Sequence, residues 1–262
     1  MPGLFHNLET MASKGAEGLA PDARKTLFDA LVRLRPPDAY YAFFAWLCLR
    51  ALDPSAPEIA AVERHLLTCP TASPIDALCA RLVKLNAAPS ALTRLRALFF
   101  VARNPPRDVY ASFLHALTLD VVFARGIPRP VKRLIGKRLH VTPDAPTPRL
   151  AAKLTLTSPG HPDCDTLKTA LLQRRRPTGG FVSSANAASP DLLATAVARF
   201  ALMTHAPTGL TPEHTAADLA FTEACWADDA LFAPLPYSTR GDAEYTFYAL
   251  LSLGTGRWPS VF

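Results

Sequence analysis

Four stretches of the chain share one twelve-residue pattern of polar and apolar positions. Each begins with Asp, has a small residue four places later and ends with Leu eleven places after the Asp. The positions between are apolar almost all round, as from Tyr40 to Leu49, and a helix of that kind is buried on every side. Two fainter copies keep the closing Leu and lack the Asp. The six copies span residues 38–49, 74–85, 108–119, 145–156, 191–202 and 242–253.

Six further segments lie between the repeated ones and mix charged with apolar residues. Their apolar residues recur at helical spacing, for example at Leu27, Leu31 and Leu34. This pattern predicts helices with one buried and one wet face. The segments span residues 22–34, 58–69, 91–102, 130–141, 165–175 and 213–226.

The alternation of a half-wet helix with a buried one, six times over, predicts an all-α fold. We expect a single domain over residues 1–262, an (α/α)6 toroid in which six outer helices surround six inner ones. A straight solenoid of helix pairs is the alternative. It fits less well because its concave face would expose a long row of aromatic side chains to water.

Two long connections lead into the last two repeated helices, at residues 177–189 and 227–241. Loops of that length in a compact domain tend to be functional. We therefore expect any site at the rim near the N-termini of the inner helices.

Composition favours a soluble, cytoplasmic protein of bacterial type. The longest apolar run, residues 40–49, is much shorter than the ~20 residues that span a bilayer. The start of the chain lacks a basic segment followed by an apolar core, as a secretory signal would have. The five cysteines are scattered and odd in number, which suits free thiols in a reducing compartment.

The net charge of +6 is concentrated in the middle of the chain, where residues 125–176 carry 12 basic and 3 acidic side chains. Such a block attracts phosphates or anionic lipid, so peripheral membrane contact is one interpretation and a solvated outer face is the other. We expect no nucleic-acid partner, because no nucleic-acid-binding motif accompanies the charge. Three consecutive arginines, Arg174, Arg175 and Arg176, precede Gly179 and could bind a diphosphate at the rim. Their alternative role is a positively charged helix C-terminus.

Residues 179–202 carry a more specific pattern. They begin Gly179-Gly180-Phe181 and continue with Asp191-Leu192 and a Thr at 195. This resembles the repeat of the prenyltransferase and squalene-cyclase family, and residues 244–254 look like its final repeat. The resemblance implies an α/α toroid around an apolar, aromatic-lined cavity that holds an isoprenoid chain.

The metal-binding motif of that family is largely missing. Its protein prenyltransferases bind zinc through Asp-x-Cys at the start of one inner helix and His in the last. Asp191 matches the Asp, but Leu193 replaces the Cys and Tyr245 the His. A single carboxylate cannot supply the three protein ligands of a catalytic zinc, so we expect no metal site and no cofactor. Zinc or magnesium is the alternative, but no ligand motif supports it.

The other mechanisms of the family lack their residues as well. Ser183, Ser184 and Ala185 replace the basic residues that grip the diphosphate, and the Asp-x-Asp-Asp acid of the cyclases is absent from the chain. Asp229-Ala-Leu-Phe stands where another Asp-Gly-Gly-Phe would be expected. Neither family mechanism can be carried over as it stands.

Asp191 and Asp242 are the candidate catalytic residues, because they are flanked by the two long loops. The repeated Asp has a structural interpretation as a helix N-cap. Its functional interpretation is a carboxylate at the cavity mouth that binds a cation or donates a proton if burial raises its pKa.

Seven side chains of the repeated helices are candidate ligand contacts. The aromatic ones are either core or cavity lining, and His115 is either a satisfied core imidazole or an acid–base group. They are Tyr40, Phe44, Tyr110, Phe113, His115, Tyr245 and Tyr248.

Three functions compete. The best-supported one is a toroid that binds or processes an isoprenoid or another apolar small molecule. The second is a non-catalytic helical scaffold that docks a partner protein. The third, a carbohydrate-active barrel, needs two carboxylates ~5–10 Å apart in an aromatic cleft and longer insertions than this chain has.

Overall fold

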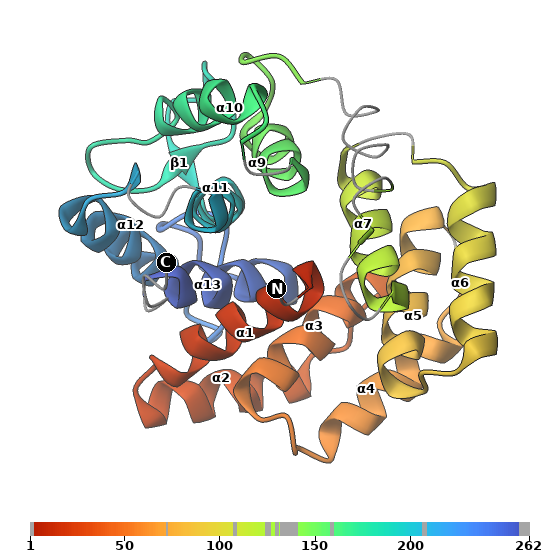
Figure 1. Cartoon of the computed structure of the whole chain (residues 1–262). Coiled ribbons are helices and arrows are strands. Elements are labelled where there is room, and N and C mark those ends of the chain that lie inside the picture. Colours follow the sequence, from red (N-terminus) through yellow and green to blue (C-terminus); the bar gives the residue numbers. More distant parts are fainter. Residues whose placement is uncertain are drawn as a thin grey trace.

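The computed structural model describes residues 3–71, 73–106, 109–123, 127–128, 131, 141–157, 160–205 and 209–256. Within these ranges the chain forms twelve helices and one two-stranded sheet (Figure 1). The fold is predominantly helical, which confirms the all-α class predicted from the alternating pattern.

Each of the six repeated segments contains a helix, and these helices are deeply buried. In α3 every side chain from Ala42 to Leu49 is buried, whereas α6, between two repeated segments, buries only Ala97. The repeated helices are α3 (Ala39–Leu52), α5 (Pro74–Ala87), α7 (Val109–Phe123), α9 (Thr147–Leu156), α11 (Leu192–His205) and α13 (Ala243–Thr255).

Five of the six intervening segments also form the predicted helices. The segment at 130–141 lies outside the described residues except for Val131 and Val141. The five helices are α2 (Pro21–Arg33), α4 (Glu58–Thr68), α6 (Ala91–Arg103), α10 (Asp163–Leu172) and α12 (Pro212–Ala224). Apart from α2, which packs on α3, each of them contacts the two repeated helices on either side of it in the sequence.

The repeated helices contact one another in a closed order. Each packs against the next one along the chain, from α3 through α5, α7, α9 and α11 to α13, and α13 packs back against α3. Residues about 200 positions apart are therefore neighbours, as the hydrogen bond between Tyr40 and Glu244 shows.

An additional helix, α1 (Leu4–Glu17), was not predicted from the sequence. It lies beside α13 and α3 and also contacts α7 (Figure 1). Its attachments are near the C-terminal ends of these helices: the Phe5 N–H donates to the Asp120 carboxylate at 2.9 Å, and Glu9 pairs with Arg50 at 2.9 Å. Helix α1 therefore covers the C-terminal ends of α3, α7 and α13.

Two glycines allow α1 and α13 to approach closely. A Cβ atom on Gly254 would lie 1.8 Å from the Met11 carbonyl oxygen, and one on Gly15 would lie 1.9 Å from the Leu250 carbonyl oxygen. Both helices therefore need glycine at the point where their backbones touch.

The repeated Asp is a helix N-cap wherever it is described. The carboxylates of Asp38, Asp191 and Asp242 accept the backbone N–H three residues later at 2.8 to 2.9 Å. This confirms the capping interpretation for those three positions, while Asp108 lies outside the described residues.

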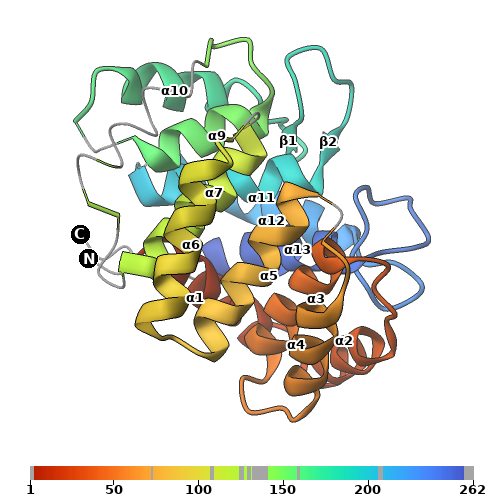
Figure 2. The same ribbon diagram turned by 90° about the vertical axis from the view of Figure 1, so that its right-hand side faces the viewer.

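The small residue of the repeat anchors the long loops. The Thr195 hydroxyl accepts the Phe181 N–H at 2.9 Å, and the Thr246 hydroxyl accepts the Phe232 N–H at 3.1 Å. In the first loop, β1 (Phe181–Val182) pairs antiparallel with β2 (Pro190–Asp191), with Phe181 opposite Asp191. The two loops project on the right of Figure 2, where the repeated helices α11 and α13 begin.

Both loops also have a residue in the left-handed backbone conformation at corresponding positions. Gly179 has φ 99° and Ala230, 51 positions later, has φ 62°. The segment 229–232 is thus built like the Gly-Gly-Phe loop, with alanine at a position that favours glycine.

Candidate ligand cavity

A cavity of about 680 Å³ lies among the repeated helices. Five of the six contribute to its wall, α5 being the exception, and α1 contributes Phe5 and Leu8. The side chains recur at every third or fourth position, so one face of each helix points to the cavity. Examples are Tyr40, Phe44 and Leu47 on α3, Tyr110, Phe113 and Leu117 on α7, Leu193, Val197 and Phe200 on α11, and Glu244, Tyr248 and Leu251 on α13.

Aromatic rings form much of the wall. Phe44 packs against Tyr40, Phe247 and Tyr248, with ring centroids 5.0 to 5.7 Å apart. The Tyr40 and Tyr110 rings are 5.7 Å apart. These are the spacings of favourable edge-to-face and tilted aromatic pairs, so the rings of the wall stabilise one another.

Exposure of the lining residues distinguishes a mouth from a floor. Those in the first turns of the helices, Tyr40, Tyr110, Leu193 and Glu244, are half-buried, and Arg149 at the start of α9 is exposed. At the opposite end, Phe5 and Leu8 of α1 are only 5% and 6% exposed. The cavity therefore opens toward the N-terminal ends of the repeated helices and is closed below by α1.

A polar corner interrupts the apolar wall near the mouth. The Tyr40 hydroxyl donates to Glu244 Oε1 at 2.5 Å. Burial raises the pKa of the Glu244 carboxyl; the hydrogen bond from Tyr40 opposes this shift, and the nearby Asp242 adds to it. The Tyr110 hydroxyl is buried beside Tyr40, with which it interacts, but it makes no hydrogen bond of regular geometry to a described residue.

Five of the seven predicted ligand contacts line this cavity: Tyr40, Phe44, Tyr110, Phe113 and Tyr248. The two others do not. His115 is buried with its ring nitrogens 2.6 Å and 2.7 Å from the carbonyl oxygens of Ala111 and Asn104.

Tyr245 follows Glu244 on the same helix. One residue turns the side chain about 100° around the helix axis, so Tyr245 leaves the cavity face that Glu244, Tyr248 and Leu251 share. Glu244 was not singled out from the sequence, but its spacing from Tyr248 would have indicated it.

The two predicted catalytic carboxylates lie outside the lining as well. Asp191 and Asp242 cap α11 and α13, as described above, and burial raises the pKa of both. Their backbone hydrogen bonds oppose that shift. In this structure the two carboxylates therefore serve as N-caps of α11 and α13.

The three consecutive arginines make contacts within the fold and do not line the cavity. Arg174 donates to the Pro143 carbonyl oxygen at 3.0 Å, and Arg176 donates to that of Ala187 at 2.7 Å. Arg175 is largely buried and pairs with Asp218 at 3.0 Å.

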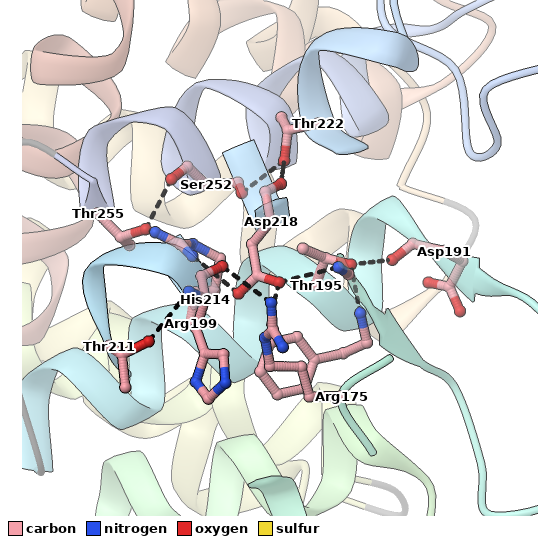
Figure 3. Close-up of polar contacts among 12 residues, drawn as sticks. Arg175, Asp191, Thr195, Arg199, Thr211, His214, Asp218, Thr222, Ser252 and Thr255 are labelled. Carbon is pink, nitrogen blue, oxygen red and sulfur yellow. Dashed lines mark hydrogen bonds and ion pairs between the residues drawn. The ribbon is translucent and has the colours of Figure 1, made fainter. Parts of the chain in front are cut away.

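Asp218 is the centre of a buried polar network (Figure 3). Its carboxylate also pairs with Arg199 at 2.9 Å and accepts the Gly180 N–H at 2.9 Å. Arg199 in turn donates to the Thr255 hydroxyl at 2.8 Å. The network joins α11, α12, α13 and the Gly-Gly-Phe loop, and its side chains are shielded from solvent. It therefore stabilises the packing of these elements and is not an open binding site.

No group of three or more His, Cys, Asp or Glu side chains that could hold a metal ion occurs in the described ranges. In the same part of the chain, none of the helices combines the length and apolar character that crossing a membrane requires.

Known proteins give no further guide to the cavity's ligand. A comparison of the chain with protein families, with curated proteins and with solved structures finds no match.

Proposed function

We propose that the chain is an (α/α)6 toroid whose central cavity binds a long apolar molecule of isoprenoid type. The closed contact order of α3, α5, α7, α9, α11 and α13 supports the toroid, because a straight solenoid would leave its first and last repeats apart. The packing of α2, α4, α6, α10 and α12 on those helices supports the outer layer.

The cavity of about 680 Å³ is the observation that carries the binding function. It falls within the ~300–1,000 Å³ of typical small-molecule sites, and its wall is mainly hydrophobic and aromatic with few polar groups. A mouth at one end and a floor at the other suit a molecule that enters lengthwise.

The resemblance of residues 179–202 and 244–254 to the prenyltransferase and squalene-cyclase repeat favours an isoprenoid over other apolar ligands. The proposal concerns binding. It includes no zinc or magnesium, because Leu193 and Tyr245 stand in place of two of the family's three ligands.

Ligand-induced stabilisation of the full chain tests this function. We expect farnesyl and geranylgeranyl chains, offered as alcohols, hydrocarbons and diphosphates with and without zinc or magnesium, to raise the melting temperature and to give a bound mass in native mass spectrometry. A ligand at about 100 times its Kd stabilises a protein by about 2.7 kcal/mol.

A matched pair of variants separates cavity binding from adsorption elsewhere. Leu193→Trp places a larger side chain in the half-buried mouth, and Leu67→Trp makes the same change on the outer face of α4, where Leu67 is 44% exposed. We expect only Leu193→Trp to abolish the stabilisation. The absence of binding by every compound would overturn the proposal.

The alternative is a scaffold that docks a partner protein, and one surface favours it. Leu92, Leu95 and Phe99 are 55%, 51% and 56% exposed on α6. Their spacing places them on one face of that helix. If no apolar ligand binds, this face becomes the first surface to test for a partner subunit.

A further inference from the structure

The polar corner of the cavity indicates which chemical group the bound chain carries. Resting on the proposed function, we infer that the ligand ends in a neutral hydroxyl group, which donates to the Glu244 carboxylate and accepts from the Tyr110 hydroxyl. The ligand class is thus a long-chain or polycyclic isoprenoid alcohol.

The charges of the lining argue against a diphosphate end. Among the described lining residues only Arg149 and Glu244 carry charge, and they cancel. At the mouth, Arg149 is exposed, whereas Glu244 is half-buried and bonded to Tyr40. A multiply charged diphosphate would therefore meet a carboxylate and a single cation, and burying charge without partners is strongly unfavourable.

The three consecutive arginines, which could have supplied more positive charge, contact other groups of the fold. Arg175 pairs with Asp218, and Arg174 and Arg176 donate to backbone carbonyl oxygens. None of them belongs to the cavity lining.

The Tyr110 hydroxyl argues for a polar ligand group at this place. It is buried at the cavity wall and has no regular hydrogen bond to any described residue. Leaving a buried hydroxyl unpaired costs about 1–3 kcal/mol, so an entirely hydrocarbon ligand would leave that penalty in place. A ligand oxygen beside Tyr110 would remove it.

The hydrogen-bonding capacities of the corner match an alcohol. Tyr40 has already given its single hydroxyl hydrogen to Glu244. The Glu244 carboxylate retains free acceptor sites. The Tyr110 hydroxyl, which makes no regular hydrogen bond and only interacts with the neighbouring Tyr40, can turn its hydrogen to a ligand oxygen. An alcohol has one hydrogen and two lone pairs, so it satisfies both.

An ammonium group suits the corner less well. It offers only hydrogens and would leave the Tyr110 donor unmatched. Its charge would also be removed from water opposite a carboxyl whose ionised form is itself disfavoured by burial.

A panel of four fifteen-carbon compounds with one chain and different ends tests the inference on the full chain. The compounds are farnesol, farnesene, farnesylamine and farnesyl diphosphate, and the measurement is the Kd of each by native mass spectrometry and calorimetric titration. We expect farnesol to bind about tenfold more tightly than farnesene and more tightly than the two charged compounds, since one or two net hydrogen bonds are worth about that factor.

Two Tyr→Phe variants provide the matched comparison. Tyr110→Phe removes the hydroxyl that faces the ligand and should reduce the preference for farnesol over farnesene to about threefold while leaving the farnesene Kd unchanged. Tyr245→Phe removes a hydroxyl from a tyrosine outside the cavity and should leave the preference at its original value. A melting temperature of each free variant that is no lower than that of the unchanged protein excludes a folding defect.

The outcomes separate this inference from the function on which it rests. If farnesene binds and farnesol has no advantage, or if the amine or the diphosphate binds best, the hydroxyl assignment is wrong while the apolar cavity stands. Failure of all four compounds to bind contradicts both.

Discussion

The guanidinium of Arg199 lies 2.9 Å from the Asp218 carboxylate, and neither side chain is exposed to solvent. Burial lowers the pKa of Arg199, and the charge of Asp218 opposes that shift. The pair links α11 to α12, and through Thr255 it reaches α13. The Asp218 carboxylate also accepts the Gly180 N–H, so it connects α11, α12, α13 and the Gly-Gly-Phe loop.

Replacing Asp218 with Ala should destabilise the fold by about 3–5 kcal/mol, because it leaves Arg199 buried without its partner. Urea unfolding followed by circular dichroism measures the change. Asp165→Ala is the control: its ion pair with Lys168 is on the surface, where Asp165 is 93% exposed, and it should change stability by less than about 1 kcal/mol. If the two variants lost similar free energies of unfolding, the buried network around Asp218 would contribute no more to stability than a surface ion pair.

Removing the N-cap of α13 should reduce the stability of the fold less than removing Asp218 does. Asp242→Ala removes the acceptor of the Tyr245 N–H and should lower the free energy of unfolding by about 1 kcal/mol. Asp242→Asn keeps an acceptor oxygen and should stay much closer to the unchanged protein. If the Ala and Asn variants unfold at the same urea concentration, the capping role is wrong.

The repeat pattern predicted the all-α class and the buried helices because it reports local requirements. A cap needs Asp at one position, and the loop needs a hydroxyl four residues later, so Asp191 with Thr195 and Asp242 with Thr246 appear in the sequence as a motif. Five of the aromatic side chains named from the sequence as core or cavity lining belong to the cavity wall.

Contacts between distant segments leave no comparable pattern in the sequence. The ion pair of Arg175 with Asp218 joins residues 43 positions apart, and nothing around the three arginines reveals it. Helix α1 was missed for a related reason. Gly15 weakens its helical pattern, yet that glycine is required by the close approach to α13, which is known only from the structure.

The close approach of α1 and α13 should tolerate no side chain. Gly254→Ala puts a Cβ 1.8 Å from a backbone oxygen, so the helices must separate, and we expect a loss of about 1–3 kcal/mol or more. Gly256→Ala is milder, because its Cβ meets the end of the flexible Leu219 side chain. Thermal unfolding compares them, and a Gly254 variant as stable as the Gly256 variant would contradict this packing.

Ala230 is a site where a substitution should stabilise the protein. Its φ of 62° is unfavourable for a residue with a Cβ, and Gly179 occupies the corresponding place in the other loop. Ala230→Gly should raise the free energy of unfolding by about 1 kcal/mol, which is the size of the left-handed penalty. Ala185→Gly, in an exposed part of the other long loop without positive φ, should be neutral or slightly destabilising. A decrease in stability for Ala230→Gly would contradict the strained conformation.

The buried carboxyl of Glu244 predicts how stability depends on pH. Burial raises its pKa in the folded protein above the usual value of 4.5, so the folded state holds this proton to a higher pH than the unfolded state does. Ionisation of Glu244 therefore destabilises the fold above the raised pKa, and the penalty disappears as the pH falls through it toward 4.5.

Glu244→Gln removes that penalty while keeping an oxygen for the Tyr40 hydroxyl. We expect the variant to melt at a higher temperature than the unchanged protein at pH 8, at a moderately higher one at pH 6, and at the same one near pH 4. Glu223→Gln, on the exposed face of α12, serves as the control and should give no such trend. If Glu244→Gln were less stable at pH 8 and gained on the unchanged protein only in acid, the carboxylate would be stabilised by its surroundings. The cavity would then have to be an environment suited to an anion, and the case for a neutral hydroxyl ligand would fail with it.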